Sequence, residues 1–179
     1  MKDFDLIRIE KCDFDLFYTY LENDFCSSER KTRSDELKAF DTPAFLPCFI
    51  RKDGLTVGYI CLWSFEEFIY VEHFAILKEY RNQNMGSAFL SEFLKEVSKK
   101  VILEVERPVD DIAKRRIEFY KRAGFYVNMY DYIQPTYYPG ADKIPMYICS
   151  FGGALSPCEY ALYTSQICSA VYPPQSELK

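Results

Sequence analysis

The sequence predicts an α/β fold in which helices flank both faces of a mixed sheet, mostly antiparallel with one parallel pair near its centre. Residues 45–65 contain two apolar strands joined by the tight-turn pair Asp53-Gly54, which is typical of a hairpin. Residues 68–124 then alternate between strand-like and helix-like periods, and such crossovers usually place neighbouring strands parallel. The 179 residues, 49% of them hydrophobic, are enough for one domain spanning 1–179.

The first half of the chain begins with a short strand and two helices. We expect the strand at Phe4–Ile9, a helix from Asp13 to Asn23, and a short helix through Phe40 that Ser34 caps. The hairpin and a third strand at Phe68–Ile76 follow, so three consecutive strands are expected to be antiparallel.

The second half supplies the crossovers and the remaining strands. An apolar stripe at helical spacing predicts a helix over Gly86–Lys99, and Val101–Glu106 follows as a strand. Asp110 and Asp111 open the next helix, whose expected apolar stripe includes Ile112 and which Gly124 ends. The last elements are two strands and a C-terminal helical extension at about 156–172, capped by Ser156, begun by Pro157 and stopped by Pro173-Pro174. These strands are expected at Phe125–Gln134 and Ile144–Phe151.

Charge is uneven along the chain. The net charge of −5 provides no overall cationic field, so we expect neither nucleic acid nor an anionic membrane as a partner. Residues 1–77 carry 9 Lys and Arg against 15 Asp and Glu, whereas residues 78–124 carry 11 against 8. The middle of the chain is therefore locally basic, which fits either a solvated helix surface or an anion site.

Seven cysteines and one histidine lack the paired spacings of a metal site, so no metal is expected and free, mostly buried thiols are the default. The first residues, MKDFDLIRIEK, include acidic side chains where a signal peptide has an apolar run. No stretch approaches the roughly 18 apolar residues of a membrane span. These observations favour a cytoplasmic location.

The stretch from Tyr70 to Ala88 places a strand, a polar loop and a helix N-terminus in immediate succession. The first amide N–H groups of a helix have no intrahelical partner, and the helix dipole adds roughly half a positive charge there. A phosphate group would be held by these donors, although a helix also begins at such a loop for purely structural reasons. The sequence contains neither the P-loop motif of NTPases nor the GxGxxG motif of dinucleotide-binding folds.

Two motifs resemble those of the GNAT superfamily of N-acetyltransferases. Residues Arg81–Ala88, RNQNMGSA, are similar to the family's acetyl-CoA motif Q/R-x-x-G-x-G/A, and Arg116–Phe125 is similar to its second signature, a helix ending in Y-x-x-x-G-F. The predicted order of elements also matches the family over about residues 4–151. Asn84 stands where the motif prefers glycine, and Asn is one of the few other residues that tolerate a left-handed conformation. Ala113 and Arg116 also depart from the family's usual residues.

The resemblance implies that acetyl-CoA is the acyl donor. Its diphosphate would lie on the amides of residues 81–87, and backbone groups of Phe74 and Ile76 would pair with its pantetheine arm. Side-chain charge would come from Arg81 and from Arg115 or Arg116. The implied diphosphate site consists of Arg81, Asn82, Gln83, Asn84, Met85, Gly86 and Ser87.

Family members usually act by direct attack of an amine in a ternary complex, and the resemblance implies this mechanism here. Tyr120 occupies the position of the family's general-acid tyrosine; the structural alternative is a tyrosine packed beside Ile117. The candidate general base is Glu72, whose pKa would rise on partial burial between apolar neighbours. Strand alternation places Glu72 and Phe74 on one face and His73 on the other, so only one of Glu72 and His73 points to the substrate. His73, water or another carboxylate are the alternative bases.

The acceptor is poorly encoded, and a small-molecule or peptide amine is expected. The alternatives are a non-catalytic acyl-CoA-binding or sensor module and a protein acetyltransferase acting on lysine or N-terminal amines. An acyl-cysteine mechanism is disfavoured, because Cys149, Cys158 and Cys168 lie where small buried hydrophobes are common. The C-terminal helix either covers the sheet or forms a contact in a homodimer. Acidic and aromatic residues that fit either a pocket for a cationic amine or a solvated surface are Glu66, Glu67, Glu72, Asp131, Trp63, Tyr70, Tyr130 and Tyr132.

Overall fold

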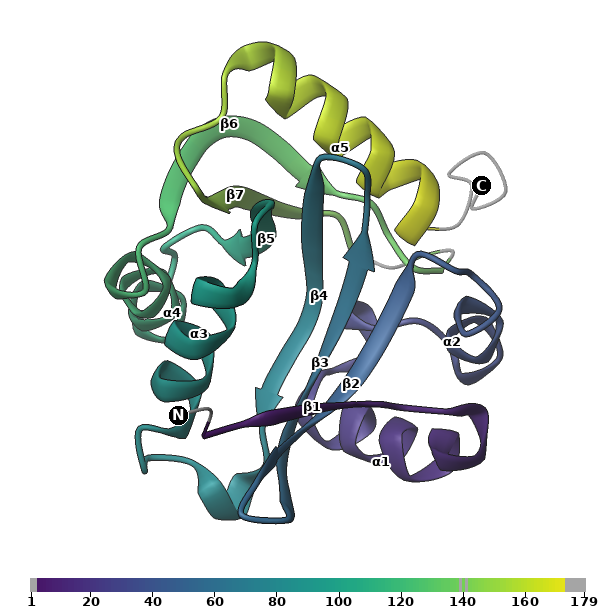
Figure 1. The fold of residues 1–179 in the computed structure, drawn as a ribbon. Helices are drawn as coiled ribbons and strands as arrows, with labels where there is room; N and C mark the ends of the chain where they lie inside the picture. Colours follow the sequence, from purple (N-terminus) through teal and green to yellow (C-terminus); the bar gives the residue numbers. More distant parts are fainter. Residues whose placement is uncertain (1–2, 139, 141, 173–179) are drawn as a thin grey trace.

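The computed structural model describes residues 3–138, 140 and 142–172. Within these residues lies a seven-stranded sheet in the order β1-β2-β3-β4-β5-β7-β6 (Figure 1). Every neighbouring pair is antiparallel except β4 and β5, which confirms the predicted mixed sheet with a parallel central pair. The strands are β1 (Asp5–Arg8), β2 (Phe45–Lys52), β3 (Leu55–Ser64), β4 (Phe68–Ile76), β5 (Lys100–Glu106), β6 (Tyr126–Gln134) and β7 (Ile144–Phe151).

Helices cover both faces of the sheet, as predicted (Figure 1). One face is buried by α1 (Phe14–Asp24), α2 (Arg33–Ala39) and α5 (Pro157–Val171), and the other by α3 (Met85–Glu96) and α4 (Asp111–Arg122). The aromatic residues of the first face pack closely; for example, the Phe68 and Tyr163 rings stack with centroids 4.3 Å apart. The C-terminal helix α5 therefore covers the sheet.

The boundaries and exposed faces of the helices correct three predictions. Thr32, not Ser34, caps α2, because its side chain accepts a hydrogen bond from Asp35 N. Helix α3 ends at Glu96 instead of Lys99, since Val97 is extended. Ile112 is 66% exposed and does not belong to the buried stripe of α4.

The cap of α5 follows the prediction. Ser156 and Glu159 form a capping box and Pro157 takes the first helical position. The expected stop at Pro173-Pro174 lies outside the described residues.

The parallel pair at the centre of the sheet separates halfway along. Its register runs from Phe68 opposite Lys100 to Val71 opposite Leu103 and then stops. Strand β4 continues to Ile76 beside β3, while β5 continues to Glu106 beside β7. The main-chain groups of β4 after Val71 that face β5 are therefore left without a strand partner.

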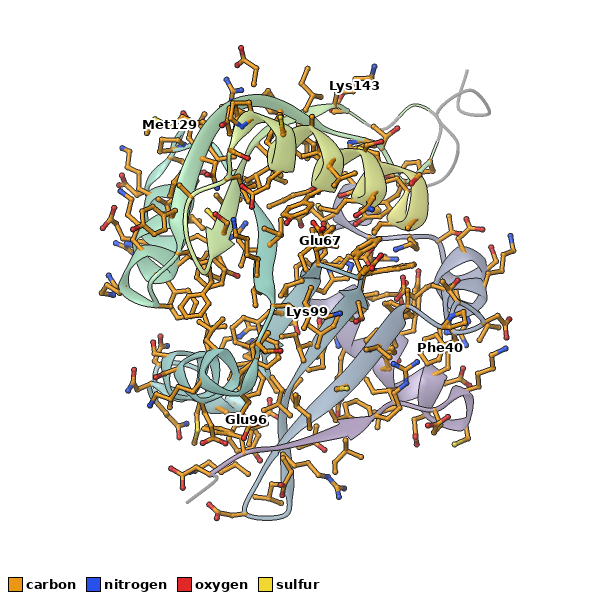
Figure 2. The ribbon with its side chains drawn as sticks, turned by 45° about the horizontal axis from the view of Figure 1, so that its top comes forward. Phe40, Glu67, Glu96, Lys99, Met129 and Lys143 are labelled. Carbon is orange, nitrogen blue, oxygen red and sulfur yellow. The ribbon has the colours of Figure 1, made fainter. Side chains whose placement is uncertain are left out.

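Among the described residues, no helix is long and apolar enough to cross a lipid bilayer. Strand β6 forms one edge of the sheet, and Met129 lies there at the periphery of the molecule with 79% of its surface exposed (Figure 2).

The seven cysteines are unpaired, but only Cys61 and Cys149 are buried, so the expectation of mostly buried thiols is wrong.

Candidate active site

The loop before α3 forms one wall of a cavity of about 550 Å³. Asn82 and Asn84 both adopt left-handed conformations, with φ of 61° and 60°, which confirms that Asn84 serves where glycine is usual. Ala88 N donates to Asn84 O at 3.0 Å, so the amides of Met85 to Ser87 precede the first hydrogen bond of the helix. The first turn of α3 carries no acidic side chain. The helix start can therefore present free N–H donors and a positive dipole end to an anion.

The side chains of two expected contacts point elsewhere. Arg81 donates through Nε to the Ile76 carbonyl at 2.7 Å and pairs with the Asp24 carboxylate. Gln83 donates to the Glu79 carbonyl at 3.0 Å and does not line the cavity. The candidate anion cradle, formed by residues 81–87, therefore offers mainly backbone donors. Arg81 nevertheless lines the cavity, together with Arg116, Phe119 and the other predicted contacts: Phe74, Ile76, Asn82, Asn84, Met85, Gly86 and Ser87.

A second cavity of about 330 Å³ opens between the diverging ends of β4 and β5. Asp24 and Phe25, at the end of α1, contribute to its wall, and Glu72 and Glu104 line it from the two strands. The two cavities share Phe74, Ile76, Arg81, Arg116 and Tyr120 in their walls and so adjoin one another. Together they form one cleft that passes between the separated strands.

Tyr120 lies at the junction of the two cavities, near the C-terminal end of α4. The following turn is closed by Gly124, with φ of 94°, and by Phe125 N donating to the Tyr120 carbonyl at 3.0 Å. Burial raises the pKa of the Tyr120 phenol to about 12, with Arg116 opposing the rise. The phenol is therefore protonated at neutral pH and can act as a hydrogen-bond or proton donor.

Strand β4 does not alternate as the sequence predicts. His73 lies opposite Cys61 and Val71 lies opposite Leu62, which leaves Glu72 as the extra residue of a β-bulge. The bulge turns Glu72 and His73 to the same face, the one covered by α1 and α2, and Phe74 to the other. The expectation that Glu72 and Phe74 share a face is therefore wrong.

The side chain of Glu72 has no exposed surface and is held by three donors. Trp63 Nε1 donates at 2.7 Å, Tyr137 OH donates at 3.0 Å, and the Lys31 ammonium forms an ion pair with it. Burial alone would raise the pKa of Glu72, but Lys31, His73 and these hydrogen bonds outweigh it and lower that pKa. The predicted rise in the pKa of Glu72 is wrong, and the physical reason is Lys31.

His73 is a buried, neutral residue. Its side chain is 2% exposed and its ring packs on Phe25 with centroids 4.5 Å apart. Neither ring nitrogen hydrogen-bonds within the described part of the chain. Burial lowers the pKa of His73 to about 4, although the Glu72 carboxylate opposes this.

Sequence reasoning did not single out Glu104, which lines the cleft together with Asp24 and Glu72. It accepts hydrogen bonds from Tyr132 OH, from Gln134 Nε2 at 2.6 Å and from Tyr172 OH at 2.7 Å. All three donors are neutral. Burial raises the pKa of Glu104, and the tyrosine and glutamine hydrogen bonds only partly offset it. The sequence does contain a signal for Glu104, because this glutamate lies between the apolar residues of a predicted strand.

The acidic and aromatic residues expected near the strand ends do not form one pocket. Glu67 accepts from Tyr163 OH at 3.2 Å, and Asp131 pairs with Arg107 at the surface. Of that group only Glu72 lines the cleft.

The fold is similar to that of known proteins. A family model described as the acetyltransferase (GNAT) domain matches residues 46–127. A structure from Bacteroides thetaiotaomicron, described as an acetyltransferase from the GNAT family, has a TM-score of 0.87 at 33% identity over 94% of this chain and 98% of that chain. No curated protein sequence matches the chain.

Two more distant structures share the fold. The ribosomal-protein-S18-alanine N-acetyltransferase from Escherichia coli has a TM-score of 0.58 at 16% identity, over 86% of this chain and 96% of that one. Naa50 from Arabidopsis thaliana, in complex with a bisubstrate analogue, has a TM-score of 0.61 at 18% identity, over 85% and 100% of the two chains.

Proposed function

Because this chain belongs to the GNAT family of acetyltransferases, we propose that it moves the acetyl group of acetyl-CoA to a primary amine by direct attack in a ternary complex. The observation that carries the proposal is the cleft between β4 and β5, with unpaired α3 amides at one end, Tyr120 at the middle and Glu104 at the other end. An anionic cosubstrate and a cationic acceptor would thus approach from different cavities.

The first cavity suits coenzyme A. The amides of Met85, Gly86 and Ser87 would hold the diphosphate, and Arg116, which is paired with Glu106, lies at the wall. Beyond Val71, the main-chain edge of β4 at Phe74 and Ile76 is not paired with β5 and would pair with the pantetheine arm as an added strand does, although Arg81 already donates to the Ile76 carbonyl. The thioester would then lie near Tyr120.

The second cavity suits the acceptor. An alkylammonium has a pKa of about 10.4 and must lose a proton before its nitrogen can attack. Glu104 takes the role of base in place of Glu72, because burial without a cation raises the pKa of Glu104 whereas Lys31 lowers that of Glu72. The nitrogen forms the amide bond, the C–S bond breaks, and Tyr120 donates to the departing sulfur.

The test is a panel of small amines and amine-bearing peptides, with acetyl-CoA and detection of released thiol. Thiol release with a small amine, accompanied by the acetylated amine in mass spectra, supports the proposal. Release with peptides alone supports a protein acetyltransferase instead. Coenzyme A binding by calorimetry without turnover of any acceptor contradicts catalysis and supports the sensor alternative.

A further inference from the structure

Lys31 forms an ion pair with Glu72, one of the carboxylates that line the acceptor cavity. The Lys31 side chain is 7% exposed, and its ammonium contacts Glu72. The ammonium also lies 5.3 Å from the centroid of the Trp63 ring and 5.1 Å from that of the Tyr137 ring. A carboxylate flanked by aromatic rings is a binding site for an alkylammonium, and here the chain's own lysine fills it.

A second buried carboxyl group lies within electrostatic reach of Lys31. Glu36, on α2, is 0% exposed, and neither of its oxygens hydrogen-bonds with any residue in the described ranges. Burial raises the pKa of Glu36 to about 7, which Lys31 opposes and Glu72 reinforces. Such an unpaired buried group is costly, and its persistence calls for an explanation. The other titratable groups that sense its charge are Cys61 and Tyr18.

Of the three carboxylates that line the acceptor cavity, Asp24 pairs with Arg81 and Glu72 pairs with Lys31, whereas Glu104 has no cation partner among the described residues. Glu72 and Glu104 follow directly after Val71 and Leu103, the last paired residues of the two parallel strands, and both line the cavity. Lys31 balances Glu72, whereas Glu104 has only neutral donors. An acceptor that arrives as an ammonium brings a positive charge that Glu104 lacks. At Glu72, however, the ammonium of Lys31 already lies where the ammonium of the acceptor would bind.

We propose that Lys31 is an exchangeable stand-in for the acceptor: when an alkylammonium enters between Glu72 and Glu104, the Lys31 ammonium turns to Glu36. The proposal rests on the proposed function, because it takes the second cavity as the acceptor site. The exchange places Lys31 beside Glu36 and the ligand between Glu72 and Glu104, so two cations serve these three buried carboxylates where Lys31 alone served them before. Lys31 and Glu36 are then positioning residues that select cationic acceptors over neutral molecules of the same shape.

The test follows the Glu36 carboxyl by carbon-13 NMR in the full chain saturated with coenzyme A. Its pKa is measured in methylammonium chloride and in potassium chloride at equal ionic strength. Methylammonium is the smallest alkylammonium and needs no turnover. The arrival of Lys31 favours the ionised carboxyl, so methylammonium is expected to lower the pKa of Glu36 by about one unit, a tenfold change in its proton affinity. An equal pKa in the two salts overturns the proposal.

Variants test the same exchange by affinity. Glu36→Gln removes the second place for Lys31, so methylammonium binding to the coenzyme A complex should weaken about tenfold. Lys31→Met keeps an apolar stem without a charge and should bind methylammonium about tenfold more tightly. Asp35→Asn, beside Glu36 but paired with Lys38 at the surface, is the matched control and should leave the affinity unchanged.

The outcomes separate the two proposals. Unchanged methylammonium affinity in both Glu36→Gln and Lys31→Met, with native circular dichroism, overturns the exchange even if acetyl transfer is active. Should Lys31→Met fail to fold, Glu36→Gln and the NMR titration still decide. Failure of coenzyme A to bind, or of any amine to be acetylated, contradicts the proposed function and is measured separately.

Discussion

Tyr120 lies where the two cavities meet, and a departing sulfur there would need a proton. Tyr120→Phe keeps the ring, so we expect kcat to fall about 100-fold, the low end for loss of a general acid, with coenzyme A affinity unchanged. Steady-state kinetics and calorimetry check this. Tyr126→Phe, exposed on β6, is the control. A wild-type rate in Tyr120→Phe would remove Tyr120 from the mechanism.

Glu104 determines the pH dependence in this mechanism. Only the ionised carboxylate can take the proton, and the pKa of Glu104 lies above the ordinary value for glutamate. We therefore expect kcat/KM to rise with pH through an ionisation above the ordinary carboxyl range. In Glu104→Gln this limb should vanish and the rate should fall about 100-fold or more. The same profile in Glu104→Gln as in Glu118→Gln, an exposed control on α4, would exclude Glu104 as the base.

These two residues show what the sequence does and does not reveal about single side chains. Tyr120 was predicted because it belongs to a local motif on one helix. The environment of Glu104 comes from Tyr132, Gln134 and Tyr172, which lie 28, 30 and 68 residues away along the chain. No local pattern encodes such a network. The pKa of Glu72 was mispredicted for the same reason, because Lys31 is 41 residues away.

Among the elements, the start of α3 is expected to bind the diphosphate, and a negative charge introduced there tests this. Gly86 lines the first cavity, and a Cβ there would meet Ile76 Cγ1 at 3.5 Å, an ordinary contact. Gly86→Ala should therefore retain coenzyme A binding. Gly86→Glu should lose it, by at least about 100-fold, because a carboxylate would occupy the place of the diphosphate. Equal affinities of the two variants in calorimetry would contradict the anion cradle.

The end of β4 that is not paired with β5 packs closely against β3 at Gly58. A Cβ on Gly58 would lie 2.4 Å from the Ala75 carbonyl oxygen, a backbone atom that cannot move alone. Gly58→Ala should shift this end of β4, destabilise the protein by about 1–3 kcal/mol, and weaken coenzyme A binding. Urea unfolding and calorimetry check both effects. A variant as stable as the wild type, with the same affinity, would show that the β4 edge is not fixed by this contact.

The elements themselves were largely predictable. Helix α3 follows from its apolar period and the hairpin from Asp53-Gly54, whose φ angles of 51° and 79° fit a tight turn. The bulge at Glu72 was not predictable, because a strand that contains a bulge has the same kinds of residues as a strand without one. It alone reversed which residues share a face with Glu72.

For the whole molecule, two buried groups give opposite dependences of stability on pH. His73 has a folded pKa of about 4 against 6.5 for a free histidine, so its contribution is full above pH 6.5 and is lost as the pH falls toward 4. Glu36 has a folded pKa of about 7 against 4.5, so its contribution is full below pH 4.5 and is lost as the pH rises toward 7. Each amounts to about 3 kcal/mol and they oppose one another.

Variants should separate these contributions. In Glu36→Gln the free energy of unfolding should fall more steeply on acidification from pH 6.5 to 4.5 than in the wild type. In His73→Phe it should rise relative to the wild type over the same interval. Urea unfolding at several pH values checks both slopes. Parallel curves for the wild type and both variants would show that neither buried group titrates as the structure implies.

For the whole molecule, the mixed sheet with one parallel pair and the two helical layers followed from the alternation of periods together with the family resemblance, whereas the order of the strands in the sheet was not predicted. The path of the cleft did not, because it depends on where β4 and β5 separate. That point, after Val71 and Leu103, comes from three-dimensional packing on both sides of the sheet.

The most direct measurement is a crystal structure of the chain with coenzyme A. Binding through the α3 amides predicts the diphosphate within about 3 Å of the N–H groups of Met85, Gly86 and Ser87, and the thiol near the Tyr120 hydroxyl. A diphosphate bound away from these amides, or no bound coenzyme A at millimolar concentration, would contradict it.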